Sequence, residues 1–81
     1  MAISVYPNPS HSHFTLEIRS ETLKDKVTVR MLDVFGKVME IRTALIQQRF
    51  EMGYNLRPGI YYVEAIQGRE KIVVKLIKGA H

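Results

Sequence analysis

The sequence predicts an all-β domain, an antiparallel sandwich or small barrel of six or seven short strands, and three observations predict it. Apolar and polar residues alternate with a period of two in several segments, which is the period of a half-buried strand. Turn signals containing Gly, Pro or Asp separate these segments about every ten residues. The 81 residues suffice for one domain, and 46% hydrophobic with 25% charged residues is the composition of an ordinary globular fold.

The first clear strands are HFTLEIRS (residues 13–20), KVTVRMLD (26–33) and KVMEIRT (37–43). In each of the first two, every second residue is apolar and the residues between are polar or small. The residues expected to face the core are Phe14, Leu16, Ile18, Val27, Val29 and Met31. The segment DVFGK joins the second strand to the third, and it predicts a tight hairpin between them. In this hairpin Asp33 can bond within the turn and Gly36 can take a positive φ.

The segment TALIQQRFEM, residues 43–52, is ambiguous, because its apolar residues fit a helical face as well as an extended chain. We interpret it as a loop followed by a short strand. Pro58 and Gly59 then predict a type II turn, with proline setting φ at the first central position and glycine supplying a positive φ at the second. A strand over residues 60–66 follows this turn, and KIVVKLIK (71–78) predicts the last strand.

The opening VYPNPS predicts a short edge strand that leaves its sheet through a stiff corner. Neither Pro7 nor Pro9 can donate to a sheet ladder, and Asn8 is pushed toward an extended conformation by the proline after it. Two prolines also protect an exposed sheet edge from pairing with another chain, and this structural purpose is sufficient on its own.

In their order and spacing, VYPNPS, FTLEI, VTVRMLDVFGKVM, NLRPGIYYVEA and KIVVKLIK resemble the C-terminal sorting domain (type A) of the type IX (Por) secretion system of Bacteroidetes-type bacteria. We expect residues 4–78 to form this domain, residues 1–3 to be cloning or linker residues, and residues 79–81 to be a tag remnant. The motif residues that carry the resemblance are Tyr6, Pro7, Asn8, Pro9, Asp33, Gly36, Lys37, Leu56, Pro58, Gly59, Tyr61, Lys75 and Lys78.

The resemblance implies an immunoglobulin-like β-sandwich at the end of a larger secreted passenger protein. It implies recognition by an outer-membrane translocon, export through the periplasm to the cell surface or medium, and removal of the domain by a sortase-like peptidase that attaches a surface anchor. The alternative is an immunoglobulin- or fibronectin-like accessory or carbohydrate-binding adhesion module. A chain without Trp and with 9% aromatic residues is poorly suited to a sugar-binding platform of exposed rings.

Other chemistries are less well supported by the residues. His11 and His13 would face the same way on an extended segment, but nothing supplies the remaining ligands of a metal site. No recognisable motif places an acidic residue to orient a base near the serines, so we expect neither an enzyme nor a cofactor. The net charge of +4 is spread along the whole chain, which favours a solvated surface over a nucleic-acid site. We expect the domain to be a monomer.

Three side chains receive specific predictions. Tyr61 alternates with the apolar residues after it and is expected to face the core, with its hydroxyl bonded to the backbone as in a tyrosine corner. Phe35 is expected to be exposed at the hairpin tip. In the last strand, Lys75 and Lys78 are expected to reach solvent, where an exposed basic strand at a sheet edge offers unpaired backbone groups together with charge.

Overall fold

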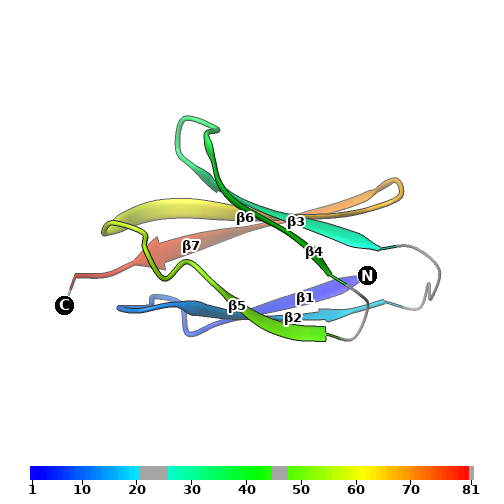
Figure 1. Cartoon of the computed structure of the whole chain (residues 1–81), viewed down its shortest axis with the longest axis horizontal. Coiled ribbons are helices and arrows are strands. Elements are labelled where there is room, and N and C mark those ends of the chain that lie inside the picture. The colour runs from blue at the N-terminus through cyan, green and yellow to red at the C-terminus, as the bar shows by residue number, and fades with distance from the viewer. Residues whose placement is uncertain (21–25, 45–47, 81) are drawn as a thin grey trace.

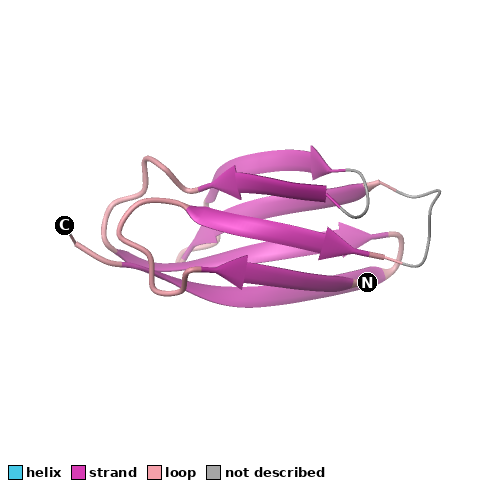
Figure 2. Cartoon of the chain, turned by 90° about the horizontal axis from the view of Figure 1, so that it is seen from below, coloured by secondary structure: helices cyan, strands magenta, loops and turns pink. Residues whose placement is uncertain are grey.

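Strands alone make up the secondary structure of the part of the chain that the computed structural model describes, residues 1–20, 26–44 and 48–80 (Figure 2). Seven strands lie within these residues. Their bounds are β1 (Ala2–Tyr6), β2 (Phe14–Arg19), β3 (Val27–Asp33), β4 (Val38–Ala44), β5 (Gln48–Met52), β6 (Gly59–Gln67) and β7 (Glu70–Lys78). The predicted all-β fold class is therefore confirmed.

The strands form two antiparallel sheets packed as a sandwich. One sheet has the order β1-β2-β5 and the other the order β4-β3-β6-β7. Figure 1 shows the four-stranded sheet above the three-stranded sheet, with the N-terminus and the C-terminus at opposite ends of the molecule. The predicted edge strand at the start of the chain is confirmed, because β1 lies at the edge of its sheet.

The core consists of the side chains that alternation directs between the two sheets. Phe14, Leu16 and Ile18 of β2 are completely buried, and so are Val27, Val29 and Met31 of β3, as predicted. The other buried apolar residues are Met52, Tyr61, Val63, Ala65 and Leu76. The alternation in KIVVKLIK predicts Ile72 and Val74 in the core together with Leu76, but both are only half-buried, because β7 is an edge strand and its first half lies at the rim of the sandwich.

The hairpin between β3 and β4 is confirmed. The carboxylate of Asp33 accepts hydrogen bonds from the backbone N–H groups of Phe35 and Lys37, both at 2.9 Å, and Gly36 has a φ of +83°. The pairing of the two strands shifts register after Met31, as a β-bulge does. One acidic side chain and one glycine therefore determine this turn, which is why local sequence was sufficient to predict it.

The prediction of a type II turn at Pro58 and Gly59 is wrong. Gly59 is the first residue of β6, pairs with Lys78 of β7, and has a φ of +154°. A type II turn requires a φ of about +80° at that position. The chain turns earlier, at Tyr54 and Asn55, directly after Gly53, whose φ is +82°. The Pro-Gly pair therefore leads into a strand, and the residue with the turn-like φ is a different glycine.

The ambiguous segment 43–52 contains the predicted short strand, which is β5. It pairs antiparallel with β2, so that Phe50 lies opposite Leu16 and Met52 opposite Phe14. The loop expected before this strand lies partly outside the described residues. The extended alternative is therefore confirmed for residues 48–52, where pairing with β2 provides the hydrogen bonds that an isolated strand lacks.

Candidate functional site

The last strand, β7, is an edge strand whose two faces differ in exposure. Leu76 and Lys78 point inward and are 0% and 4% exposed. Val73 and Ile77 point outward and are 52% and 44% exposed, and Lys75 is exposed beside them. This side of β7 therefore presents alternating cationic and apolar side chains to the outside, as the sequence predicted for Lys75.

The expectation that Lys78 reaches solvent is wrong. Its Nζ donates a hydrogen bond to the backbone oxygen of Gly53 at 2.6 Å, a second to that of Ser12, and a longer one to that of Tyr54. Removal from water lowers the pKa of the Lys78 ammonium below its usual value. The alternation that buries Leu76 also directs Lys78 inward, and backbone carbonyls from two distant loops make this burial tolerable.

Residues 7–13, which connect β1 to β2 and are called the corner below, lie along the end of β7. The amide of Asn8 donates to the backbone oxygen of Lys75 at 2.8 Å, and its oxygen accepts from the backbone N–H of Ile77 at 2.9 Å. Ser10 continues this contact, because its N–H donates to Ile77 at 3.0 Å and its carbonyl accepts from Gly79 at 2.7 Å. The corner thus occupies the edge of β7 from residue 75 onward and forms a short parallel bridge between Ser10 and Lys78.

The corner is itself held by local bonds. The hydroxyl of Ser10 donates to the backbone oxygen of His13 at 2.5 Å and accepts from the N–H of Ser12 at 3.2 Å. Pro7 and Pro9 are exposed. Tyr6, at the end of β1, is 40% exposed and donates its hydroxyl to the Glu17 carboxylate at 2.9 Å. The predicted corner after an edge strand is confirmed, and it covers the edge of the opposite sheet.

The motif around Tyr61 also lies at this end of the sandwich. Tyr61 is 8% exposed, and its hydroxyl donates to the backbone oxygen of Arg57 at 2.8 Å, so the tyrosine-corner interpretation is confirmed. Leu56 packs against the core, while Pro58 is exposed. Figure 1 shows the corner, the connection between β5 and β6, and the end of β7 gathered at the C-terminal end of the molecule.

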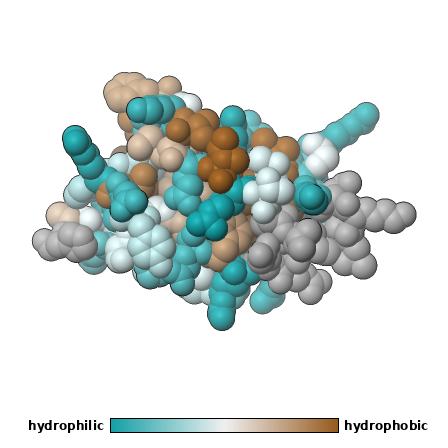
Figure 3. All heavy atoms as spheres, viewed as in Figure 1, coloured by the Kyte–Doolittle hydropathy of each residue, from teal (hydrophilic) through white to brown (hydrophobic). Residues whose placement is uncertain are grey.

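The hairpin motif occupies a separate part of the surface. Asp33, Gly36 and Lys37 build the tip of the β3–β4 hairpin, and Phe35 at this tip is 91% exposed, as predicted. Further apolar side chains are exposed on or next to β4. They are Val34, Val38, Met39 and Ile41. Figure 3 shows hydrophobic side chains gathered in the upper part of the view, over β4.

The two histidines of the corner do not converge. His11 contacts the C-terminal tail through a 2.6 Å hydrogen bond between its Nδ1 and the carbonyl of Ala80. His13 stacks on Tyr54, with 4.6 Å between ring centroids, and its Nε2 lies 3.3 Å from the Glu51 carboxylate. Within the described residues, no three His, Cys, Asp or Glu side chains lie close enough together to hold a metal ion.

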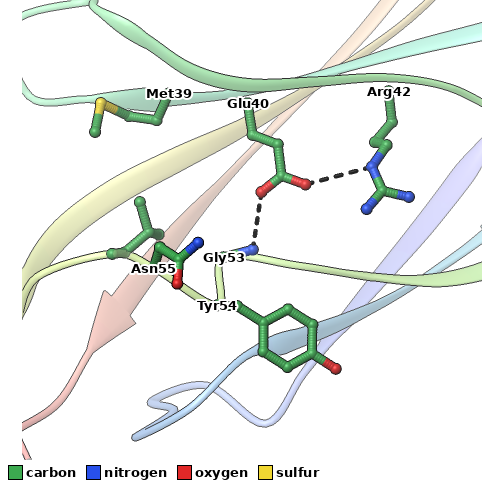
Figure 4. A pocket seen from close by; sticks show the side chains of 7 residues that line it. Met39, Glu40, Arg42, Gly53, Tyr54 and Asn55 are labelled. Carbon is green, nitrogen blue, oxygen red and sulfur yellow. Dashed lines mark hydrogen bonds and ion pairs between the residues drawn. The ribbon is translucent and has the colours of Figure 1, made fainter.

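A hollow lies between β4 and the turn that follows β5 (Figure 4). Its lining residues are Met39, Glu40, Arg42, Gly53, Tyr54, Asn55 and Leu56. The Glu40 carboxylate accepts a hydrogen bond from the N–H of Gly53 at 3.1 Å and pairs with Arg42 at 3.3 Å. The guanidinium of Arg42 lies 5.9 Å from the ring centroid of Phe50. These charged groups therefore connect the two sheets along the open flank of the sandwich.

The outer face of the four-stranded sheet contains a buried carboxylate. Glu64 of β6 is 6% exposed and pairs with Arg30 at 2.9 Å and with Lys71 at 3.1 Å. Burial alone would raise the pKa of Glu64, but the hydrogen bonds and charges of Lys71 and Arg30 outweigh burial, and the pKa lies below its usual value. Lys71 thus holds one end of β7 to β6, and Lys78 holds the other end to the loops that contain Ser12 and Gly53.

Sequence reasoning missed the partners that hold β7. Asn8 was quoted as a motif residue, but its contact with β7 joins residues 69 positions apart. The only sequence signal at Glu64 and Lys71 was the presence of a charged residue in a strand with apolar neighbours. Gly53, whose carbonyl receives the Lys78 ammonium, follows Met52 in a segment without a clear pattern.

The fold and this end of the molecule define a small β-sandwich module whose last strand is locked in place and presented at an edge. The chain matches the family model of the secretion system C-terminal sorting domain over residues 4–79, and it belongs to this family. A search of curated proteins finds no match. None of the described residues forms a helix long and apolar enough to cross a membrane.

Family membership gives the function at the level of the domain. The chain is a C-terminal sorting signal of type IX secretion and directs export to the cell surface or the extracellular space. It acts with the type IX secretion machinery as part of a larger passenger protein. The family is one of sorting signals and is not known for catalysis, and nothing in the fold or the match favours the carbohydrate-binding alternative.

Proposed function

We propose that the domain is recognised in its folded form, by an outer-membrane translocon that reads the C-terminal end of the sandwich. In this proposal the passenger is joined to the N-terminal side of the domain, and residues 4–78 form the sorting unit. A sortase-like peptidase then removes the domain and attaches the passenger to the cell surface. The domain contributes binding and no catalysis, and it acts as a monomer.

The contact between the corner and β7 is the observation that supports recognition of a folded end. Asn8 and Ser10 hold the backbone of residues 75–79, while Lys78 bonds to loops on either side. A chain end is usually poorly ordered unless such contacts hold it. This strand is held by the corner, by Gly53 after β5 and by its pairing with β6, so its conformation depends on the fold as a whole.

A reporter fusion tests the proposal. Wild-type and variant domains are fused to the C-terminus of a reporter that carries an N-terminal signal peptide, in a bacterium with a type IX system. The reporter is then measured in the medium, on the surface and in the periplasm. We expect export with the wild-type domain and retention in the periplasm after deletion of residues 72–78. Normal export after this deletion would exclude the C-terminal end as the part that is read.

Two lysine variants separate recognition from stability in this assay. Lys75→Ala removes an exposed cation and keeps the fold, so loss of export would assign Lys75 to recognition. Lys78→Ala removes buried hydrogen bonds, so its loss of export should follow its loss of stability. Removal of the domain is checked by the size of the surface-bound reporter. A surface reporter that keeps the full domain would exclude cleavage.

A further inference from the structure

Along the first half of β7, the backbone groups that point away from β6 have no hydrogen-bond partner among the described residues. The bonds from the corner show that the backbone groups of Lys75 and Ile77 point away from β6. Alternate residues of an antiparallel strand point their backbone groups to the same side, so those of Lys71 and Val73 also point outward. Among the described residues, no hydrogen bond reaches these outward groups of Lys71 and Val73.

The corner shows that the outward backbone groups of β7 form hydrogen bonds with another segment of the chain. Asn8 imitates a neighbouring strand with one donor and one acceptor, and Ser10 adds two backbone bonds. The corner thus fills the edge from the carbonyl of Lys75 to Gly79, and it leaves open the outward groups of Lys71 and Val73 and the N–H of Lys75. An open edge of this kind is a template for one further strand.

The side chains along the open edge define the chemistry of such a strand. Lys71 and Lys75 are exposed on the outer face, on either side of Val73, and the Lys71 ammonium also pairs with the Glu64 carboxylate. On the inner face, Ile72 and Val74 are only half-buried, so apolar surface remains at the rim. A complementary strand places acidic side chains beside the lysines and apolar side chains beside Ile72 and Val74, and these two sets alternate along it.

We propose that residues 71–75 of β7 bind one extended segment of a partner protein, in which acidic and apolar residues alternate, and that this segment adds to the four-stranded sheet as a new strand. The inference deepens the proposed function and rests on it for the identity of the partner as a component of the secretion machinery. The binding itself requires only the edge and its side chains.

A synthetic peptide in which Glu alternates with Val tests the binding on the full chain. We expect the peptide to bind and its binding to weaken with added salt. Bound peptide should protect the amides of Lys71, Val73 and Lys75 from hydrogen exchange. The control peptide has the same sequence but carries N-methyl groups on the residues whose N–H groups would point toward β7. Its charge is unchanged, and it lacks the N–H donors that would pair with β7. Equal binding of both peptides, or protection elsewhere in the domain, would overturn the proposal.

Variants of the chain test the same edge from the other side. Val73→Pro removes an outward N–H that the pairing with β6 does not use, and proline is tolerated at such edge positions. We expect it to weaken peptide binding at least about tenfold, whereas Val73→Thr keeps the N–H and binds as the wild type does. Lys75→Glu changes an exposed side chain, so we expect it to keep the fold and to weaken binding of the acidic peptide as well. Unchanged binding to both Val73→Pro and Lys75→Glu contradicts the proposal.

Export assays distinguish failure of this inference from failure of the proposed function. If Val73→Pro is folded, does not bind the peptide and is not exported, the edge is the surface that the machinery uses. If the wild-type domain directs export and folded Val73→Pro does so equally well, the sorting function stands and docking at this edge is excluded. If even the wild-type fusion stays in the periplasm while the peptide still binds the edge, the proposed function fails and the binding site remains.

Discussion

The side chain of Asn8 accepts a hydrogen bond from the backbone N–H of Ile77 at 2.9 Å, although the two residues are 69 positions apart. The same side chain donates to the backbone oxygen of Lys75. A single amide therefore replaces a neighbouring strand along this stretch of β7 and joins the beginning of the domain to its end.

Replacing Asn8 by Ala should loosen the end of β7. The change removes two hydrogen bonds at a partly solvated edge, so we expect a loss of about 1 kcal/mol in the free energy of unfolding. The amide of Ile77 should exchange with solvent faster, because its acceptor is gone. Asn55→Ala is the matched control, since Asn55 is also an exposed loop asparagine. An Ile77 amide that stays as protected as in the wild type would show that the Asn8 contact does not hold β7.

Lys75 and Lys78 should differ sharply when each is changed to Met. Lys78→Met keeps the apolar stem but leaves the carbonyls of Ser12 and Gly53 without their donor, and we expect a loss of about 2–3 kcal/mol. Lys75→Met should stay within about 0.5 kcal/mol, as is usual at exposed positions. Urea unfolding of both variants measures the difference. Equal stabilities would mean that the Lys78 ammonium does not form these hydrogen bonds.

Glu64 should make stability depend on acid pH. The pKa of Glu64 in the fold lies below its ordinary value of 4.5, because Lys71 and Arg30 outweigh the effect of burial. Below pH 4.5 the unfolded chain therefore binds a proton that the folded chain still excludes, and stability falls as the pH decreases toward the folded pKa. Above pH 4.5 the contribution is fully present.

Thermal unfolding between pH 7 and about pH 2 measures this dependence. Glu64→Gln cannot titrate, so its stability should be lower near neutral pH and should decrease less between pH 4.5 and the acid limit. Parallel curves for the wild type and Glu64→Gln would contradict the ion-paired state of Glu64.

Gly53 and Gly36 form a matched pair, because their φ angles are +82° and +83°. A Cβ on Gly53 would lie 3.1 Å from Phe14 and 3.2 Å from Leu56, whereas one on Gly36 meets nothing within 4 Å. We expect Gly36→Ala to cost about 1–2 kcal/mol from backbone strain alone. Gly53→Ala should cost about 1–3 kcal/mol more through crowding. Equal losses in urea unfolding would show that the core next to Gly53 is loosely packed.

The sequence by itself determined the features that depend on neighbouring residues. Alternation identified the buried faces of β2 and β3 and placed Tyr61 in the core, because the side chains of a strand point to opposite faces in turn. Asp33 and Gly36 identified the hairpin, since its bonds and its positive φ lie within a few residues. The order of these local signals along the chain was also enough to indicate the sorting-domain family.

The tertiary structure alone decided how β7 is held and which part of its edge is free. Alternation already placed Lys78 on the face of Leu76, but its charge suggested solvent, and only carbonyls 25 and 66 positions away make its burial possible. In the same way, Pro58 and Gly59 are residue types that favour a turn, but Gly59 lies in a strand because it pairs with Lys78. Contacts between distant segments depend on how the two sheets pack, and a local pattern of residue types does not encode that packing.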